Sequence, residues 1–151
     1  MIDGLYETHL VVDDVETQME FYEDTLGFEL GKYDEDRGIA FYFIPGENES
    51  MLGLWENEPS DCPHFAAGHF AVRVSEDDIP SMIPFVEERG IEPKEMYGCS
   101  AEEPIVQPWL PAANVYFDDP EGNLVELHAK LPDEPDLDAE QMSLSEWRDR
   151  N

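Results

Sequence analysis

Two histidines and one glutamate are the residues whose types and spacing could carry out chemistry. His9 and His69 each open a short run of apolar residues, and the two runs occur in similar segments of the chain. Glu126 lies inside the apolar stretch Leu-Val-Glu-Leu, where a carboxylate needs a partner because burying an unpaired charge is costly. Two imidazoles and one carboxylate can bind one divalent metal ion (Fe, Mn, Zn, Ni or Co). Such a set leaves coordination positions open for water, substrate or dioxygen.

Each of these residues also has a purely structural interpretation. A histidine in a strand is commonly structural or exposed, and Glu126 can face solvent because alternate residues of a strand do. Tyr116 precedes a turn on a central strand, where it is either an acid–base group or a buried aromatic. His128 shares the face of Glu126 by alternation, so it either flanks the site or ends the strand in solvent. We predict Tyr116 and His128 as the catalytic groups.

An internal repeat must position the two histidines. Each copy begins with a β-forming run, continues into a helical pattern, and ends that helix at a glycine, Gly27 or Gly90. The pattern predicts strands over residues 8–12, 28–32, 39–44 and 50–55, and again over residues 69–74, 91–96, 114–117 and 123–128. Each copy is therefore a βαβββ module. We expect an α+β fold in which two modules pack as a pseudo-twofold pair, each a curved mixed sheet with a helix on its outer face.

Capping signals predict where the two helices begin. Asp13 with Glu16 three residues later is typical of a capping box, in which each residue bonds a free backbone N–H of the first turn. In the second copy, Ser81 as the N-cap leaves Pro84 in the first turn, where its missing N–H is harmless.

The modules predict one domain over residues 1–131, with module one over about 5–60 and module two over about 66–131. The acidic segment 132–151 has no counterpart in the first module and is either an appended arm or partly disordered. Asp138 or Ser145 would cap a short helix there.

A long segment of the second module, residues 94–113, interrupts the regular pattern. Long loops in small domains often cover a functional site, although this one can also be a plain packing loop. We predict that Tyr97 and Trp109 from this segment, with Trp55 from the first module, form an apolar wall of the substrate pocket.

The segment Tyr-Phe-Asp-Asp-Pro-Glu-Gly-Asn-Leu-Val-Glu-Leu over residues 116–127, with the repeat and its two histidines, resembles the vicinal oxygen chelate superfamily. That superfamily includes glyoxalase I, extradiol dioxygenases and bleomycin-resistance proteins. The resemblance implies that the first and last strands of the modules supply the metal ligands, here His9, His69 and Glu126. A fourth ligand, present in glyoxalase I, would fall at Leu54, which cannot bind metal. Glu56 would replace it only if the register slipped.

The resemblance implies a metal-dependent enzyme that chelates a small substrate through vicinal oxygens, either dioxygenase-like or lyase- and isomerase-like. The alternative is a metal-free small-molecule binding protein of the bleomycin-resistance type. A third hypothesis is an interaction module without pocket chemistry.

Charge restricts the partners of the chain. Its 151 residues include 37 Asp and Glu against 8 Lys and Arg, which gives a formal net charge of −29. A surface this negative repels nucleic acid and anionic membranes. Carboxylates spread along the whole chain are typical of a salt-adapted protein, but an ordinary acidic protein or a nucleic-acid mimic fits them too. With no signal peptide, no spanning segment and no Cys-x-x-Cys pair, we expect a cytoplasmic protein. We also expect it to form a homodimer.

Overall fold

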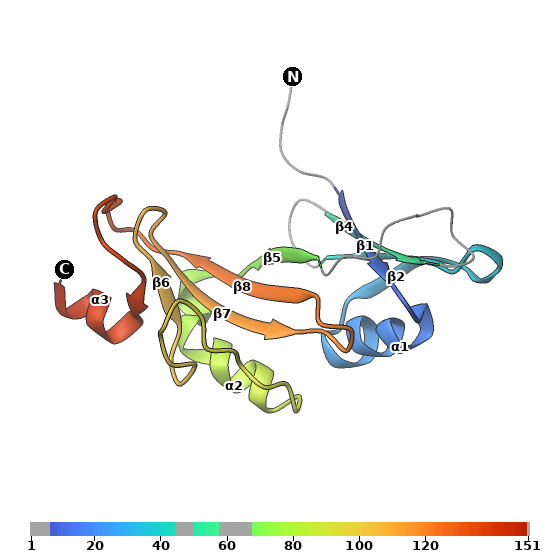
Figure 1. Ribbon diagram of the computed structural model, residues 1–151, viewed down its shortest axis with the longest axis horizontal. Coiled ribbons are helices and arrows are strands. Elements are labelled where there is room, and N and C mark those ends of the chain that lie inside the picture. Colours follow the sequence, from blue (N-terminus) through green and yellow to red (C-terminus); the bar gives the residue numbers. More distant parts are fainter. Residues whose placement is uncertain (1–6, 45–49, 58–67, 151) are drawn as a thin grey trace, which may run out of the picture. The chain divides into compact units, whose positions relative to one another are not determined.

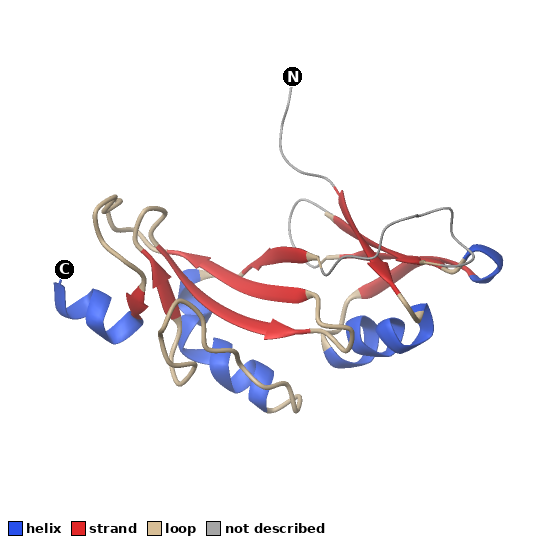
Figure 2. Ribbon diagram, in the orientation of Figure 1, coloured by secondary structure: helices blue, strands red, loops and turns tan. Residues whose placement is uncertain are grey.

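In the computed structural model, residues 7–44, 50–57 and 68–150 are described (Figure 1). The chain divides into two compact units. Unit 1 comprises Met1–His69 and Asp119–Asn123, and unit 2 comprises Phe70–Asp118 and Leu124–Asn151. Each unit combines strands with helices (Figure 2), which confirms the α+β class.

Unit 1 contains a four-stranded sheet in the order β1-β4-β3-β2, with β1 parallel to β4 and the other neighbours antiparallel. Alternate strand residues such as Leu10, Tyr42 and Leu54 are fully or almost fully buried, and they define the helix-covered face. The elements are β1 (Glu7–Val12), α1 (Val15–Met19), the π-helical η1 (Glu20–Thr25), β2 (Glu29–Asp34), η2 (Glu35–Arg37), β3 (Ile39–Phe43) and β4 (Met51–Glu56).

The first helix begins one residue later than the capping box predicted. Asp14 is the N-cap, and its carboxylate accepts a hydrogen bond from Thr17 N at 2.9 Å. The prediction of Asp13 is wrong because the backbone of Asp14 is still extended, with φ −139° and ψ 100°, so the helix starts only at Val15. The predicted glycine stop is confirmed, since Gly27 adopts a φ of 77°, which favours glycine.

The second sheet has the strand order β5-β8-β7-β6-β9, and α2 lies on one side of β7 and β8 (Figure 1). Helix α2 follows Ser81 and carries Pro84 in its first turn, as predicted. The elements are β5 (His69–Arg73), η3 (Glu76–Ser81), α2 (Met82–Glu87), β6 (Ile105–Gln107), β7 (Ala112–Asp118), β8 (Leu124–Lys130), β9 (Met142–Ser143) and α3 (Leu144–Arg150).

One predicted strand of the second module is absent from the described chain. Residues 91–96 form no strand, and β6 lies further on, within the segment expected to be a loop. A single backbone bond, from Lys94 N to Tyr116 O at 2.7 Å, connects this stretch to β7. Pro93 beside it has no N–H to donate, so a continuous ladder cannot form there.

The C-terminal arm, residues 132–150, is folded as a part of unit 2. Its strand β9 pairs antiparallel with β6, and Trp147 of α3 is only 2% exposed. Neither Asp138 nor Ser145 caps α3, contrary to the prediction. Instead Ser143 Oγ accepts a bond from Glu146 N at 3.2 Å, three residues into the helix.

Candidate functional site

The face of the unit 1 sheet opposite its helix, called here the open face of unit 1, is aromatic around one imidazole. His9 lies opposite Gly53 in the register of β1 and β4. Its ring contacts those of Phe41 and Trp55 edge-on, with centroids 6.0 and 5.6 Å apart. A Cβ atom at position 53 would overlap His9 Nδ1, so the glycine makes room for the ring.

Both ring nitrogens of His9 face protein groups. Trp55 Nε1 donates a hydrogen bond to His9 Nδ1 at 2.7 Å. Because an indole nitrogen only donates, Nδ1 must be the acceptor and a neutral His9 carries its proton on Nε2. That Nε2 atom lies 3.5 Å from Glu7 Oε1. In this arrangement neither nitrogen offers a lone pair to a metal ion.

A cation on this face was not anticipated from the sequence. The guanidinium of Arg37 lies over the ring of Trp55, 5.7 Å from its centroid, as in a cation–π contact. Arg37 belongs to η2, which the sequence analysis did not assign, and no spacing signal linked it to Trp55.

The position expected for a fourth ligand carries no metal-binding atom. Leu54 is fully buried on the helix-covered face, and its open-face neighbours on β4 are Gly53 and Trp55. Glu56 lies on the same face of β4 as Leu54, against Gly38. The shift in register that would bring Glu56 to the position of the fourth ligand is therefore not adopted.

One face of the unit 2 sheet, called here the open face of unit 2, carries Tyr116 of β7 with Glu126 and His128 of β8. Glu126 on β8 is 7% exposed and lies opposite Tyr116 on β7, which is 2% exposed. His128 Nδ1 is 3.3 Å from Glu126 Oε1. The structure therefore brings Glu126, Tyr116 and His128 together, with Tyr116 buried as its structural interpretation anticipated.

Burial raises the pKa of Tyr116 above its ordinary value. A hydrogen bond from Gln107 opposes this rise, whereas the charge of Glu126 and a hydrogen bond with it reinforce the rise. Tyr116 therefore stays protonated, and its hydroxyl donates a hydrogen bond to the carboxylate of Glu126.

Two glutamines near this face were missed in the sequence. Gln107 Nε2 donates to Tyr116 Oη at 3.2 Å, and Gln141 Nε2 of the arm donates to Gln107 Oε1 at 3.1 Å. Gln107 lies on a strand within the segment that was predicted as a loop. Its position on the same sheet face as Tyr116 could therefore not be predicted. Gln141 follows no periodic signal.

The three residues predicted to form the aromatic wall lie in three different environments. Tyr97 packs edge-on against Tyr116, with ring centroids 6.1 Å apart, and adopts a φ of 56°, which is unusual for a residue other than glycine. Trp109 is 57% exposed in the turn before β7. Trp55 contacts His9 in unit 1, so the structure pairs two of the three predicted residues with predicted site residues.

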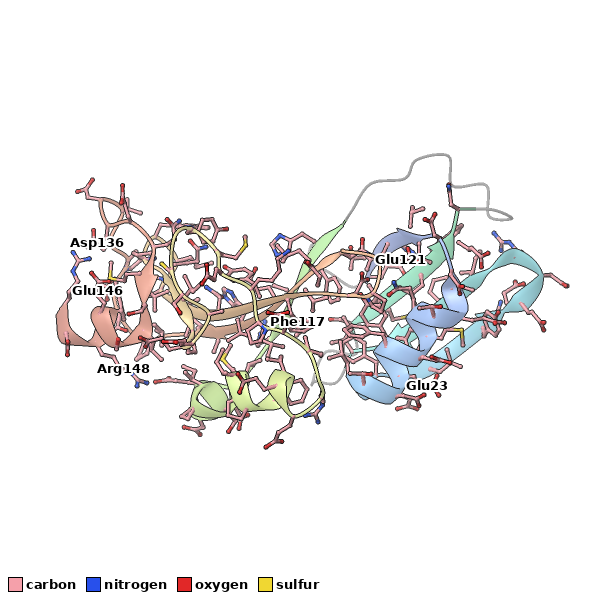
Figure 3. The ribbon with its side chains drawn as sticks, turned by 60° about the horizontal axis from the view of Figure 1, so that its bottom comes forward. Glu23, Phe117, Glu121, Asp136, Glu146 and Arg148 are labelled. Atoms are coloured by element: carbon pink, nitrogen blue, oxygen red, sulfur yellow. The ribbon has the colours of Figure 1, made fainter. Side chains whose placement is uncertain are left out.

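The segment Asp119–Asn123, part of the stretch that carried the family resemblance, makes structural hydrogen bonds within unit 1. The carboxylate of Glu121, labelled in Figure 3, accepts bonds from Asp13 N at 2.6 Å and Asp14 N at 2.8 Å, at the start of α1. Asn123 Oδ1 accepts a bond from Gly68 N at 2.7 Å.

Asp119, whose exposure is only 5%, is the central acceptor of these hydrogen bonds. It accepts hydrogen bonds from Glu121 N, Asn123 N and Asn123 Nδ2, and a further one from Tyr22 Oη at 3.0 Å. Burial, with the charge of Asp119, raises the pKa of Tyr22. These contacts are structural, and they explain the motif without assigning it chemistry.

The predicted metal ligands are divided between the units, His9 and His69 in unit 1 and Glu126 in unit 2. Within the described ranges, no group of three or more His, Cys, Asp or Glu side chains is gathered to hold a metal ion. Two imidazoles and a carboxylate suit a divalent cation in chemistry. His9 fits only if Trp55 releases Nδ1, so the trio remains a prediction.

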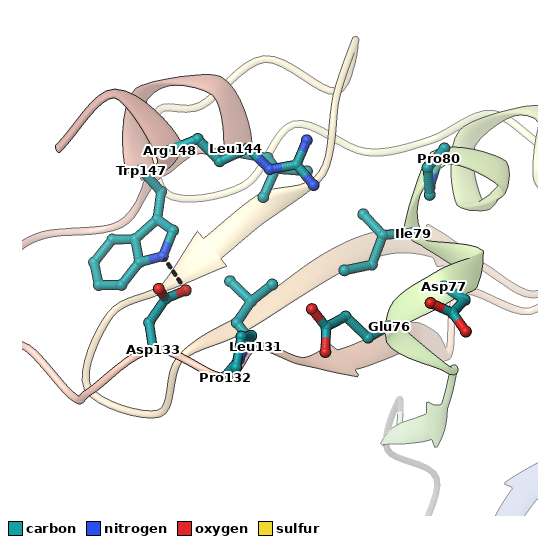
Figure 4. Close-up of a pocket in the computed structure, with 10 residues that line it drawn as sticks. All are labelled: Glu76, Asp77, Ile79, Pro80, Leu131, Pro132, Asp133, Leu144, Trp147 and Arg148. Atoms are coloured by element: carbon teal, nitrogen blue, oxygen red, sulfur yellow. Dashed lines mark hydrogen bonds between the residues drawn. The ribbon is translucent and has the colours of Figure 1, made fainter. Parts of the chain in front are cut away.

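A cavity of about 390 Å³ in unit 2 is lined by residues of η3 on one side and of Leu131 and the arm on the other (Figure 4). Trp147 donates to Asp133 Oδ2 at 3.0 Å on its rim, and the ten residues drawn in Figure 4 include no predicted site residue. Cys99 is a free thiol, and Cys62 lies outside the described residues. No helix in the described part of the chain is long and apolar enough to cross a membrane.

Solved structures with the same fold cover most of the chain. An integron cassette protein from the mobile metagenome of the Halifax Harbour sewage outfall is 30% identical, with a TM-score of 0.70 over 85% of this chain and 99% of that one. A glyoxalase/bleomycin resistance protein/dioxygenase from Nocardioides is 26% identical, with a TM-score of 0.66 over 93% and 91%. A lactoylglutathione lyase from Agrobacterium tumefaciens, 21% identical with a TM-score of 0.65 over 85% and 94%, shares the fold.

A match to a family model assigns the chain to a protein family. A comparison with curated proteins finds no match. The model described as Glyoxalase/Bleomycin resistance protein/Dioxygenase superfamily matches residues 4–127 and therefore most of the chain. The two-sheet fold agrees with the βαβββ modules of that superfamily. The chain belongs to the glyoxalase/bleomycin resistance protein/dioxygenase superfamily.

Proposed function

We propose that this protein is a metal-dependent enzyme that acts on a small substrate bound through vicinal oxygens, with His9, His69 and Glu126 as the metal ligands. The observation that carries the proposal is Glu126, a carboxylate only 7% exposed on a sheet face that also presents Tyr116 and His128. A buried carboxylate is costly unless its charge is used or paired.

A bound divalent ion would polarise the substrate oxygens as a Lewis acid. Around Glu126, the chain itself positions two groups that can carry a proton. Tyr116 Oη keeps its proton and directs it at the carboxylate, and His128 Nδ1 lies 3.3 Å from Glu126 Oε1. His128 is 26% exposed on its side chain, so its ring can meet a small molecule while Glu126 orients it.

Metal content tests the proposal. The protein is purified in concentrated KCl, which suits its acidic surface, stripped of metal, and titrated anaerobically with Fe(II), Mn(II), Zn(II), Ni(II) and Co(II). We expect stoichiometric binding of one of these ions, lost in His69→Ala and Glu126→Gln. Trp55→Phe should bind the ion about fivefold more tightly, because it removes a hydrogen bond of roughly 1 kcal/mol that competes for Nδ1.

Trp109→Phe is the matched control, since it also removes one tryptophan but from an exposed turn. Equal metal affinity in Trp55→Phe and Trp109→Phe would exclude His9 as a ligand. Absence of metal from every variant would sink the proposal.

A metal-free small-molecule binding protein is the second candidate, and one hydrogen bond supports it. With Nδ1 accepting from Trp55 and Nε2 facing Glu7, His9 acts as a part of the aromatic surface around it. On that reading the open face of unit 1 binds a ligand by stacking, and Trp55→Phe weakens ligand binding without revealing a metal site.

A further inference from the structure

We propose that the C-terminal arm is a working part of the site: Gln141 orients the amide of Gln107, and that amide commits the hydroxyl proton of Tyr116 to Glu126. The proposal rests on the proposed function for the role of Glu126 as a ligand. The contacts that carry it all lie within unit 2.

The contacts form one directed series. Gln141 Nε2 donates to Gln107 Oε1 at 3.1 Å, and Gln107 Nε2 donates to Tyr116 Oη at 3.2 Å. Tyr116 is hydrogen-bonded to Glu126, its register partner on β8. Gln107 and Tyr116 therefore each accept a hydrogen bond from the group before them and donate one to the group after them.

The carboxylate selects the direction of this series. An ionised Glu126 only accepts hydrogen bonds, whereas an amide side chain can turn and exchange its donor for its acceptor. If Gln107 presented its oxygen to Tyr116, the hydroxyl would donate to Gln107 and turn its lone pairs toward the buried carboxylate. The amide nitrogen at Tyr116 avoids this repulsion, and Gln141 supports it by donating to the amide oxygen that then faces the arm.

The arm is anchored firmly enough to set that orientation. Gln141 immediately precedes β9, which pairs with β6, the strand that carries Gln107. Glu103 accepts bonds from Ser145 N at 2.8 Å and Ser145 Oγ at 2.7 Å at the start of α3. Met142, Leu144 and Trp147 are buried on either side of this contact. Gln141 is thus a positioning residue that acts on Glu126 through two others.

Reversal of the series is the decisive test. In Gln141→Glu the new side chain only accepts, so Gln107 should turn its nitrogen toward the arm and its oxygen toward Tyr116. The hydroxyl then donates to Gln107 and leaves Glu126. Gln107→Glu should produce the same reversal directly. The readout is the Cζ resonance of Tyr116 in protein labelled with [4-13C]tyrosine, assigned among the six tyrosines by its loss in Tyr116→Phe.

We expect the Tyr116 resonance to move in the same direction in both variants, with a smaller movement in Gln141→Ala, which frees the amide without reversing it. The double variant Gln141→Glu/Glu140→Gln keeps the net charge and should retain the full shift, because Glu140 is an exposed neighbour outside the series. A response to Gln107→Glu alone, no response to either, or a shift cancelled by Glu140→Gln would overturn the proposal. Mn(II) titration of the same samples is read separately: failure to bind metal in the wild type counts against the proposed function, while the resonance still decides the role of the arm.

Discussion

The open faces of the two units, which come from two copies of one βαβββ pattern, hold their central polar residue in opposite ways. His9 in unit 1 lies among aromatic rings, with its side chain 39% exposed and Nδ1 bonded by an indole. Glu126 in unit 2 is nearly buried and belongs to a directed polar series. One face is thus shaped mainly by ring packing and the other mainly by hydrogen bonds to a charge.

This difference predicts unequal costs for the loss of a single donor. A buried carboxylate that loses a donor bears a desolvation penalty that water cannot relieve, whereas a part-exposed imidazole can bond water instead. Matched substitutions on the two faces can therefore break or sharpen the comparison.

The largest effect is expected for Tyr116→Phe, which removes the hydroxyl that donates a hydrogen bond to Glu126. Hydrogen bonds to charged groups contribute roughly 1.5–3 kcal/mol, so the free energy of unfolding should fall by about 2 kcal/mol. Urea unfolding at fixed KCl concentration measures it. Trp55→Phe, which removes the donor to the exposed His9, should cost no more than about 1 kcal/mol beyond the lost indole packing. Equal losses in the two variants would mean that the faces do not differ in the way described.

A second, smaller effect tests the packing on unit 1. Gly53→Ala places a Cβ where His9 Nδ1 lies, so the ring must move and its bond with Trp55 must break. Overpacking of this kind costs about 1–2 kcal/mol, measured by the same unfolding assay.

The control for that variant also removes the imidazole ring with which the new methyl group collides. In Gly53→Ala/His9→Ala the new methyl group has space, so the double variant should be no less stable than His9→Ala alone. Additive losses would show that the glycine serves some purpose other than accommodating the ring.

The sequence was sufficient for most elements of the modules, but not for the strand at 105–107 or for the partners of the site residues. The repeat, the glycine stops and the start of α2 follow from local rules, and these predictions are confirmed by Gly27, Gly90 and Ser81. The strand that carries Gln107 was missed because a three-residue strand has no detectable alternation. The bond between Trp55 and His9 joins two strands distant in sequence, and Glu121 binds the N–H groups of Asp13 and Asp14 from more than a hundred positions away. Such long-range contacts leave no periodic signal.

The smallest effect concerns the arm. Burial favours the neutral form of Glu103, but hydrogen bonds from Ser145 and Ser143 outweigh it and hold the pKa of Glu103 below its ordinary value. A lowered folded pKa means that this stabilisation is present above the unfolded pKa and is lost as pH falls through the folded value.

Glu103→Gln should therefore cost about 0.5–1 kcal/mol at neutral pH and show less loss of stability than the wild type on acidification below pH ~4. Unfolding followed by the fluorescence of buried Trp147 measures both, with Trp55→Phe/Trp109→Phe as the background that isolates this signal. A parallel pH dependence in the two proteins would contradict the assignment to Glu103.

The turn at Asp119–Asn123 also imposes an order on folding. Its bonds to the first helix join residues 107 and 108 positions apart, and the bond from Tyr22 to Asp119 spans 97. Closing loops of this length costs more entropy than local pairing, and it slows folding. On a ribosome the first helix would emerge early and wait for Glu121, so unit 1 cannot be completed until the chain through residue 123 has been made. Unit 1 is therefore first in sequence but cannot finish before much of unit 2 has been synthesised.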